Sequence, residues 1–440
     1  MSKYLELFTG SFNESIVEKT KPENKPYVAY SIKAGKVAYT VLPREIKPNE
    51  FWYKTSDGNK MEYKYYYMVE GTGVPVYDYI KVPELGDMIG NYKVVSHELD
   101  SQTGYYIMSF DKNLTTLPSW ERHFGGLGGD EIPQGFEIES HIPTKLFSEI
   151  IISQSIEYIK KYHDHADRHE TVYNEGVITD FINYDTCEKI SISKNNKLLD
   201  SRDNSNSIIE TETDTLLFAC KNTTIPVSVK HIGDSIFVNS HLKTIDIPSG
   251  ILSIGSGCYS ENQLFITDCI TLPETIEYIG SNAFSNRLIV KADFINNSSL
   301  DAEINSYWGA IVADHKSEEG LYYNDTITVK YAGENNTTIN IPEGVTVIDT
   351  NTFGESGGSY SYLTINLPST ITTLKECSIG GIEFITVNYN GTKEQWNSIT
   401  KESEWSAYSC AGDYDNFWDD PYFIIHCTDG DVTVNGRWWA

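Results

Sequence analysis

Three histidines interspersed with carboxylates are the residues of this 440-residue chain whose types and spacing come closest to metal chemistry. They are His163, His165 and His169, within the run Tyr162–Glu170. Imidazole is a common ligand of transition metals. In a strand, His163 and His165 would share one face, and in a helix His165 and His169 would do so. A structural metal ion is one interpretation, and a solvated charged loop is the one that we favour.

A second acidic cluster lies near the C-terminus. Its carboxylates flank Phe417-Trp418 and are those of Asp413, Asp415, Asp419 and Asp420. Such oxygens bind Ca²⁺, but their spacing is not that of an EF-hand, so we again favour a solvated loop. The chain shows no set of nucleophile, base and orienting group, and no pair of glycosidase carboxylates stands out. We therefore expect a protein that is not an enzyme and has no cofactor.

Aromatic side chains are the third group that could bind a ligand, because Tyr and Trp suit protein surfaces and sugar rings. The candidates lie where the sequence pattern is interrupted or near the C-terminus, and they are Tyr307, Trp308, Trp405, Trp418, Trp438 and Trp439. The alternative is that each ring caps an apolar edge of the core.

A recurring phrase predicts how the chain positions these residues. An apolar residue and proline are followed after seven residues by glycine and after four more by an aromatic residue. The three copies contain Pro226, Gly233 and Phe237, then Pro248, Gly255 and Tyr259, then Pro273, Gly280 and Phe284. Proline recurs after 22 and then 25 residues, a period typical of a solenoid of stacked turns.

Each part of the phrase has a physical role. The apolar residues before proline alternate with polar ones, which predicts a short half-buried strand, and proline ends that strand. The next apolar pair, such as Ile251 and Ile254, is expected in the core, glycine permits a close backbone path, and the aromatic ring fills the space between turns.

Two later copies are degenerate. After Pro342, Asp349 replaces the glycine while the aromatic position is kept by Phe353. After Pro368, the two positions are Lys375 and Ile379. We expect altered turns within the same fold.

Three motifs around these repeats resemble the BspA-like leucine-rich repeats, common in surface proteins of gut and oral bacteria and in some of their phages. Residues 200–226 are similar to the family's segment from "DSR" to "CKNT-IP", with Ser207 and Ala219 where the family has Ala and Gly. Residues 389–399 resemble its "Y-GT-EQW-I" cap, and residues 425–431 its "I-CTDGD" turn. The resemblance covers residues 180–436 and implies a mainly β, leucine-rich-repeat solenoid. It also implies that Asp200, Asp203, Asn204 and Asn206 cap turns.

The predicted organisation places a small β module before the solenoid. The expected parts are an N-terminal β module at 1–75, irregular and eroded repeats at 76–175, a repeat block at 176–290, a loop-rich insert at 291–330, and a second repeat block with a C-terminal cap at 331–440. In the module, residues 27–32 and 36–41 read as a hairpin, and the tyrosines of residues 63–67 as a strand.

Charge and cysteine content limit the partners. The net charge of −28 has no basic stripe, so we expect no binding to nucleic acid. Residues 1–10 do not read as a signal peptide or lipoprotein leader, and no stretch is long enough to insert in a membrane. Cys187 and Cys220 occupy positions where the family also has cysteine, which implies core-filling thiols of a reducing compartment.

The expectation that follows is a structural or adhesion protein of a bacteriophage virion, made in the cytoplasm of its host. Its partners would be other virion proteins and a host-surface glycan or protein, and homo-oligomerisation stays open. The alternatives are a secreted adhesin on a bacterial cell surface and a glycan-degrading virion enzyme.

Overall fold

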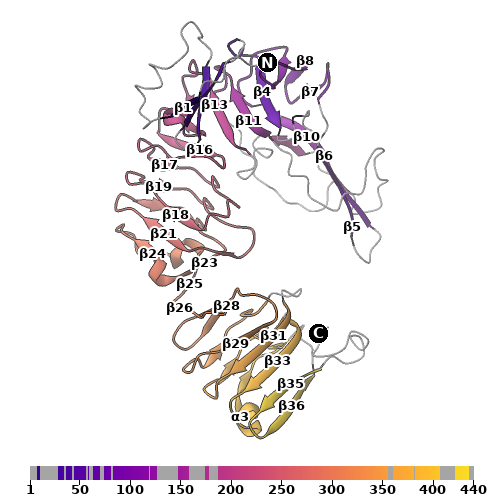
Figure 1. Ribbon diagram of the computed structural model, residues 1–440, viewed down its shortest axis with the longest axis vertical. Helices are drawn as coiled ribbons and strands as arrows, with labels where there is room; N and C mark the ends of the chain where they lie inside the picture. The colour runs from indigo at the N-terminus through magenta and orange to yellow at the C-terminus, as the bar shows by residue number, and fades with distance from the viewer. Residues whose placement is uncertain are drawn as a thin grey trace. The chain divides into compact units, whose positions relative to one another are not determined.

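Alternating apolar and polar residues give the chain a mainly β structure with little helix, as predicted (Figure 1). The computed structural model describes residues 44–55, 58, 83–117, 147–157, 187–354, 360–380, 382–406 and 422–435, and the backbone of seven further strands, β1, β2, β3, β5, β6, β10 and β12. Within this part of the chain, no helix is both long and apolar enough to span a membrane.

The chain divides into two compact units. The first comprises residues 1–240, 248–259 and 275–283, and the second comprises residues 241–247, 260–274 and 284–440.

The strands of the first unit form antiparallel sheets and one ladder of solenoid turns. They are β1 (Leu7–Thr9), β2 (Val28–Lys33), β3 (Lys36–Val41), β4 (Glu50–Thr55), β5 (Tyr63–Val69), β6 (Val74–Ile80), β7 (Met88–Ile89), β8 (Tyr92–Leu99), β9 (Tyr106–Phe110), β10 (Ser119–Gly125), β11 (Phe147–Ile152), β12 (Asn174–Val177), β13 (Lys189–Ile192), β14 (Leu199–Asp200), β15 (Ser207–Glu210), β16 (Thr215–Ala219), β17 (His231–Ile232), β19 (Ser253–Ile254) and β22 (Tyr278–Ile279).

The N-terminal part of this unit is built from antiparallel strands. The predicted hairpin is present, with β2 paired to β3, and the tyrosine-rich strand is β5. A six-stranded sheet has the order β13-β11-β4-β9-β8-β7, in which β4, β8, β9 and β11 pair antiparallel. The described residues of 76–175 are therefore not repeat turns, although the sequence favours eroded repeats there. An apolar residue followed by proline also occurs outside repeats, so it does not by itself predict a repeat turn. The sheet here is determined by pairing between strands that are distant in sequence.

The solenoid ladder of the first unit begins at β16. Strands β16, β17, β19 and β22 pair in parallel, one strand per turn. The repeat residues take their predicted places, since Ile251 and Ile254 are fully buried and the rings of Phe237 and Tyr259 stack 4.9 Å apart. The backbone nitrogen of Gly255 donates to the carbonyl of Ile232 in the preceding turn at 2.8 Å.

The strands of the second unit form further ladders. They are β18 (Thr244–Asp246), β20 (Phe265–Ile266), β21 (Cys269–Leu272), β23 (Arg287–Val290), β24 (Phe294–Asn296), β25 (Ile311–Ala313), β26 (His315–Lys316), β27 (Leu321–Tyr323), β28 (Thr328–Tyr331), β29 (Thr337–Asn340), β30 (Val347–Ile348), β31 (Tyr360–Leu367), β32 (Thr373–Leu374), β33 (Ile382–Tyr389), β34 (Thr400–Lys401), β35 (Tyr422–Cys427) and β36 (Gly430–Asn435).

Within 291–330, where the sequence predicts a loop-rich insert, β24 and β25 continue the ladders and β26, β27 and β28 form a separate antiparallel sheet. Strand β24 pairs in parallel with β21, and β25 pairs in parallel with β23. The chain between them contains two 3₁₀ turns, η2 (Lys291–Asp293) and η3 (Ser306–Gly309). The antiparallel strands β26, β27 and β28 follow. The proline–glycine phrase is lost here, but the strand pairing is kept.

The C-terminal sheet has the order β29-β31-β33-β35-β36, parallel except for the last pair. One helix, α3 (Lys393–Ser398), begins at a capping box formed by Thr392 and Gln395. The degenerate repeats keep the backbone hydrogen bond between turns, since the nitrogen of Lys375 donates to the carbonyl of Ile348 at 3.1 Å. Lys375 and Asp349, which replace the glycines, also form an ion pair of 2.9 Å.

A substitution at Gly255 tests how closely successive turns approach each other. A Cβ at this position would lie 2.5 Å from the backbone nitrogen of Asp234 in the preceding turn. We expect Gly255→Ala to lower the free energy of unfolding by about 1–3 kcal/mol, measured by thermal denaturation followed by circular dichroism. Ser256→Ala, which adds no atom at the next residue, is the control. An unchanged midpoint for Gly255→Ala would contradict the close approach.

Candidate functional site

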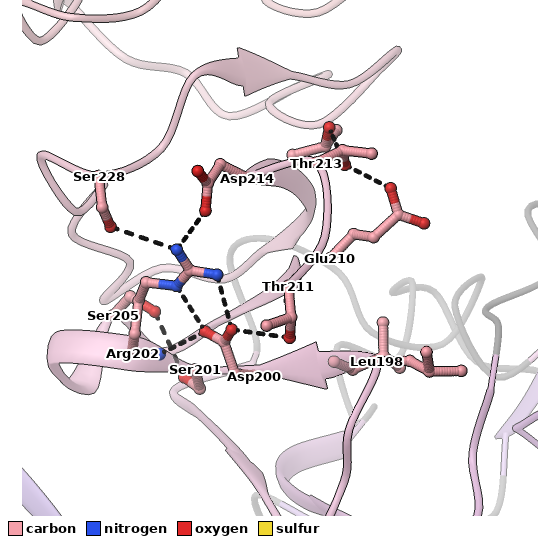
Figure 2. Close-up of polar contacts among 12 residues, drawn as sticks. Leu198, Asp200, Ser201, Arg202, Ser205, Glu210, Thr211, Thr213, Asp214 and Ser228 are labelled. Carbon is pink, nitrogen blue, oxygen red and sulfur yellow. Dashed lines mark hydrogen bonds and ion pairs between the residues drawn. The ribbon is translucent and has the colours of Figure 1, made fainter.

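A charged cluster around Arg202 lies where the chain enters the solenoid. Figure 2 shows the guanidinium between the carboxylates of Asp200 and Asp214, beside the hydroxyl of Ser228. The Nε and Nη2 atoms of Arg202 donate to the two oxygens of Asp200 at 2.9 and 2.7 Å, and Nη1 donates to Asp214. Thr211 donates its hydroxyl to Asp200 at 2.9 Å.

The electrostatics of the cluster favour the charged forms. Partial burial alone would raise the pKa of Asp200, but hydrogen bonds from Arg202 and Thr211 outweigh it and lower that pKa. The hydrogen bonds to Asp200 raise the pKa of Arg202 above its usual range. The backbone of Asp203, Asn204 and Asn206 is left-handed, with φ of 54, 55 and 50°, which short polar residues tolerate. One guanidinium bridges two carboxylates, so the cluster joins the turn of η1 (Arg202–Asn204) to Asp200 and Asp214.

Asp200 makes stability depend on pH in a defined direction. Because its pKa is lowered in the folded protein, its contribution is present above the unfolded pKa of about 3.9 and is lost as pH falls through the folded value. We expect Asp200→Asn to lower the unfolding midpoint at pH 7, and the gap from wild type to shrink below about pH 4. The exposed Asp246→Asn is the control, and a gap independent of pH would contradict the assignment.

A second ion pair is fully buried in the second unit. The side chains of Arg287 on β23 and Glu261 are 0% and 2% exposed, and Nη2 donates to Oε1 of Glu261 at 2.5 Å. Arg287 also donates to the carbonyl of Leu242 at 2.7 Å and to the hydroxyl of Thr267 at 3.3 Å. The backbone nitrogen of His241 donates to the same Oε1 at 3.0 Å. This pair ties strand β23 to two loops of the stack.

Removing one partner of this buried ion pair should lower the stability of the folded protein. Glu261→Ala leaves the Arg287 charge buried and unpaired, so we expect the free energy of unfolding to fall by about 3–5 kcal/mol in a chemical denaturation experiment. The matched control is Glu303→Ala, which breaks the exposed pair of 2.6 Å with Lys291 and should leave stability unchanged. Equal effects of the two variants would contradict the role of burial.

A network around Glu149 crosses three strands of the first unit. In register on the sheet, Glu149 of β11 lies between Lys54 of β4 and Lys189 of β13, at 3.4 and 3.8 Å. Tyr105 donates its hydroxyl to Glu149 at 2.5 Å. Burial would raise the pKa of Glu149, but Lys189, Tyr105 and Lys54 outweigh it and lower the value. Burial lowers the pKa of Lys189. The described contacts are those of a cross-strand ion-pair network.

The exposed face of the C-terminal sheet carries the most regular polar array among the described residues. An amide ladder is formed by Asn340, Asn366 and Asn388 on adjacent strands, where each Nδ2 of Asn366 and Asn388 donates to the preceding amide oxygen at 2.8 Å. Beside it runs a hydroxyl row, Thr338, Thr364 and Thr386, two residues earlier on the same strands. Parallel strands repeat at about 4.8 Å, so both rows have that period.

The other face of the same strands is core. Ile339, Ile365 and Val387 lie between the polar positions in sequence, and each is 0% exposed, as is Ile425 on the next strand. Because successive side chains of a strand point to opposite faces, the amide ladder and the hydroxyl row face outward. Tyr362, which is 49% exposed, lies on the outward face of β31 beside them. The ladder ends at Glu319, which accepts from Asn340 at 3.1 Å, and at the pair His426–Asp431 of 3.0 Å.

The aromatic residues selected from sequence have different positions. Trp308 is buried at 5% exposure and stacks on Phe294 with ring centroids 6.4 Å apart, while Tyr307 meets the same ring edge-on at 5.2 Å. Trp405 is half-buried and packs against Trp396 and Phe423. Trp308 is therefore part of the core, Trp405 packs against a core cluster, and Tyr307 is half-buried beside Phe294. The remaining candidates, Trp418, Trp438 and Trp439, lie outside the described residues.

The candidate metal ligands also lie outside the described residues. They are the histidines His163, His165 and His169, and the aspartates Asp413, Asp415, Asp419 and Asp420. Among the residues that the structure describes, no three His, Cys, Asp or Glu side chains are grouped to hold a metal ion.

Sequence reasoning missed the polar face, although a signal was present. The tripeptide Thr-(Ile/Val)-Asn occurs at residues 338–340, 364–366 and 386–388, once per turn. These Thr and Asn residues alternate with the apolar residues of the strands and are not part of the proline–glycine phrase that predicts the solenoid. The buried ion pair of Arg287, by contrast, has no periodic signal in the sequence, because its partner Glu261 is distant in sequence.

The comparison with protein families agrees with this geometry. The model of the BspA type leucine rich repeat region matches residues 203–307 and 329–403, in six copies. These two ranges form a BspA-type solenoid of about six turns. No curated protein matches the chain.

Proposed function

We propose that this chain is a non-enzymatic structural and adhesion protein that displays its solenoid to bind a neutral glycan on a host cell surface. The observation that carries the proposal is the outward face of the C-terminal sheet, with its amide ladder and hydroxyl row. A repeat region of the BspA type supports a surface or adhesion role.

The chemistry of this face favours a neutral glycan over other occupants. Both rows are uncharged in a chain of net charge −28, and charged residues occur at the ladder's ends. Asn340 and Asn366 each use one donor and one acceptor in these bonds, and Asn388 uses one donor. A primary amide has two N–H donors and an oxygen with two lone pairs, so each keeps further hydrogen-bonding capacity. Amides and hydroxyls pair well with sugar hydroxyls, and the exposed ring of Tyr362 suits stacking on a sugar.

The setting that we propose is a bacteriophage virion, with the N-terminal β strands as the attachment part. Support comes from the resemblance of the repeats to those of gut-bacterial and phage surface proteins, and from the β2–β3 hairpin that precedes them. Mass spectrometry of purified particles tests this setting. Detection of the chain only in a bacterial cell envelope would instead support a cell-surface adhesin.

The binding face is tested separately from the setting. We expect Asn366→Ala combined with Asn388→Ala to weaken binding to purified neutral surface polysaccharide of the host by about tenfold or more, through lost hydrogen bonds. The control is Ser369→Ala, an exposed residue in the turn after β31. Affinity would be measured by calorimetry. Unchanged binding by the double variant would contradict the assignment of the face, and release of shortened glycan would contradict the non-enzymatic role.

A further inference from the structure

Two cysteine thiols meet near the start of the solenoid. Cys187 and Cys220 are both 0% exposed and lie in the same apolar cluster. The backbone nitrogen of Lys221 donates to the carbonyl of Cys187 at 3.1 Å, and Asn222 donates its side chain to the carbonyl of Glu188 at 3.1 Å. These two hydrogen bonds hold the segments side by side. The sulfur of Cys187 donates to the carbonyl of Lys189 at 3.8 Å, and that of Cys220 donates to the carbonyl of Asn206 at 3.1 Å.

The two thiols are not equivalent. The neighbouring Cys220 thiol and burial raise the pKa of Cys187 well above its usual value. The neighbouring Cys187 thiol lowers the pKa of Cys220, against the effect of burial. Cys220 is therefore the first of the pair to lose its proton, and a thiolate is the reactive form of cysteine. A thiolate with a second thiol in contact is the arrangement from which a disulfide forms.

We propose that Cys187 and Cys220 are a redox site that closes to an intrachain disulfide on exposure to a peroxide. The Cys220 sulfur attacks one oxygen of hydrogen peroxide, the O–O bond breaks, and the leaving hydroxide takes a proton to become water. The resulting sulfenic acid reacts with Cys187, which gives up its proton as the S–S bond forms and a second water leaves. The two sulfurs lose two electrons in total, and the peroxide gains them.

The disulfide would connect the segment entering β13 to the end of β16, where the solenoid ladder begins. A cross-link between these points restricts the unfolded chain and stabilises the folded one. The redox site lies where the chain enters the solenoid, and it is independent of the proposed glycan-binding face.

The test uses the full-length protein. Exposed thiols are blocked under native conditions, the protein is treated with hydrogen peroxide, and peptides are mapped by mass spectrometry without reduction. We expect one linked pair of peptides, containing Cys187 and Cys220, that a dithiol reductant separates. Cys258 is equally buried and serves as the internal control, expected to remain a thiol. Recovery of Cys187 and Cys220 as free thiols or as sulfinic acids would overturn the proposal.

Thermal unfolding gives a second readout. We expect peroxide to raise the unfolding midpoint of wild type by several degrees, and to have no such effect on Cys220→Ser or Cys187→Ser. A rise that persists in Cys220→Ser would overturn the proposal. If both serine variants fail to fold, the peptide map of the wild-type protein decides the question.

Discussion

The spacing between successive turns is the constraint on which the rest of this structure depends. A single turn cannot bury its own apolar side chains, so each one relies on backbone hydrogen bonds and packing to its neighbours. Gly255 permits that approach, since a Cβ would meet the backbone of the preceding turn. In the later turns Asp349 and Lys375 replace glycine and form an ion pair, and the nitrogen of Lys375 still donates to the carbonyl of Ile348 in the preceding turn. The backbone bond between turns is therefore kept where the glycine is lost.

The strongly acidic composition does not prevent burial of charge. The described carboxylates that are most buried are each supplied with a base: Glu261 with Arg287, Glu50 with Arg44, and Glu149 with two lysines. Such pairs cost desolvation energy that offsets much of their mutual attraction. The lysines of Glu149 lie on strands already paired to β11 through the backbone, whereas Arg287 of β23 reaches the loop residues Glu261 and Leu242. A limited supply of 34 lysines and arginines is thus partly used inside the protein, which leaves the surface acidic.

Periodicity made much of the solenoid predictable, because local alternation determines which side chains face inward. It correctly placed Ile251, Ile254 and the stacked rings of Phe237 and Tyr259. It was misleading at Trp308, where the phrase is lost but the strand pairing continues and the indole is buried. Neither the antiparallel pairing of β4, β9 and β11 nor the partner of Arg287 could be predicted, since both depend on contacts between residues distant in sequence.

The same alternation separates what determines the fold from what can determine binding. In each turn of the C-terminal sheet a buried residue such as Ile365 lies between two outward ones, Thr364 and Asn366. Changing an outward side chain leaves the packing of the inward one intact, so the outward rows can vary at little cost in stability. The Thr and Asn of three turns are nevertheless alike, and their match is not required by the core. At the Asn positions the ladder itself favours uniformity, because each amide donates to the amide of the preceding turn at 2.8 Å. The Thr positions have no such bond to one another among the described contacts, so their match is the part of the pattern that the proposed repeating ligand would explain.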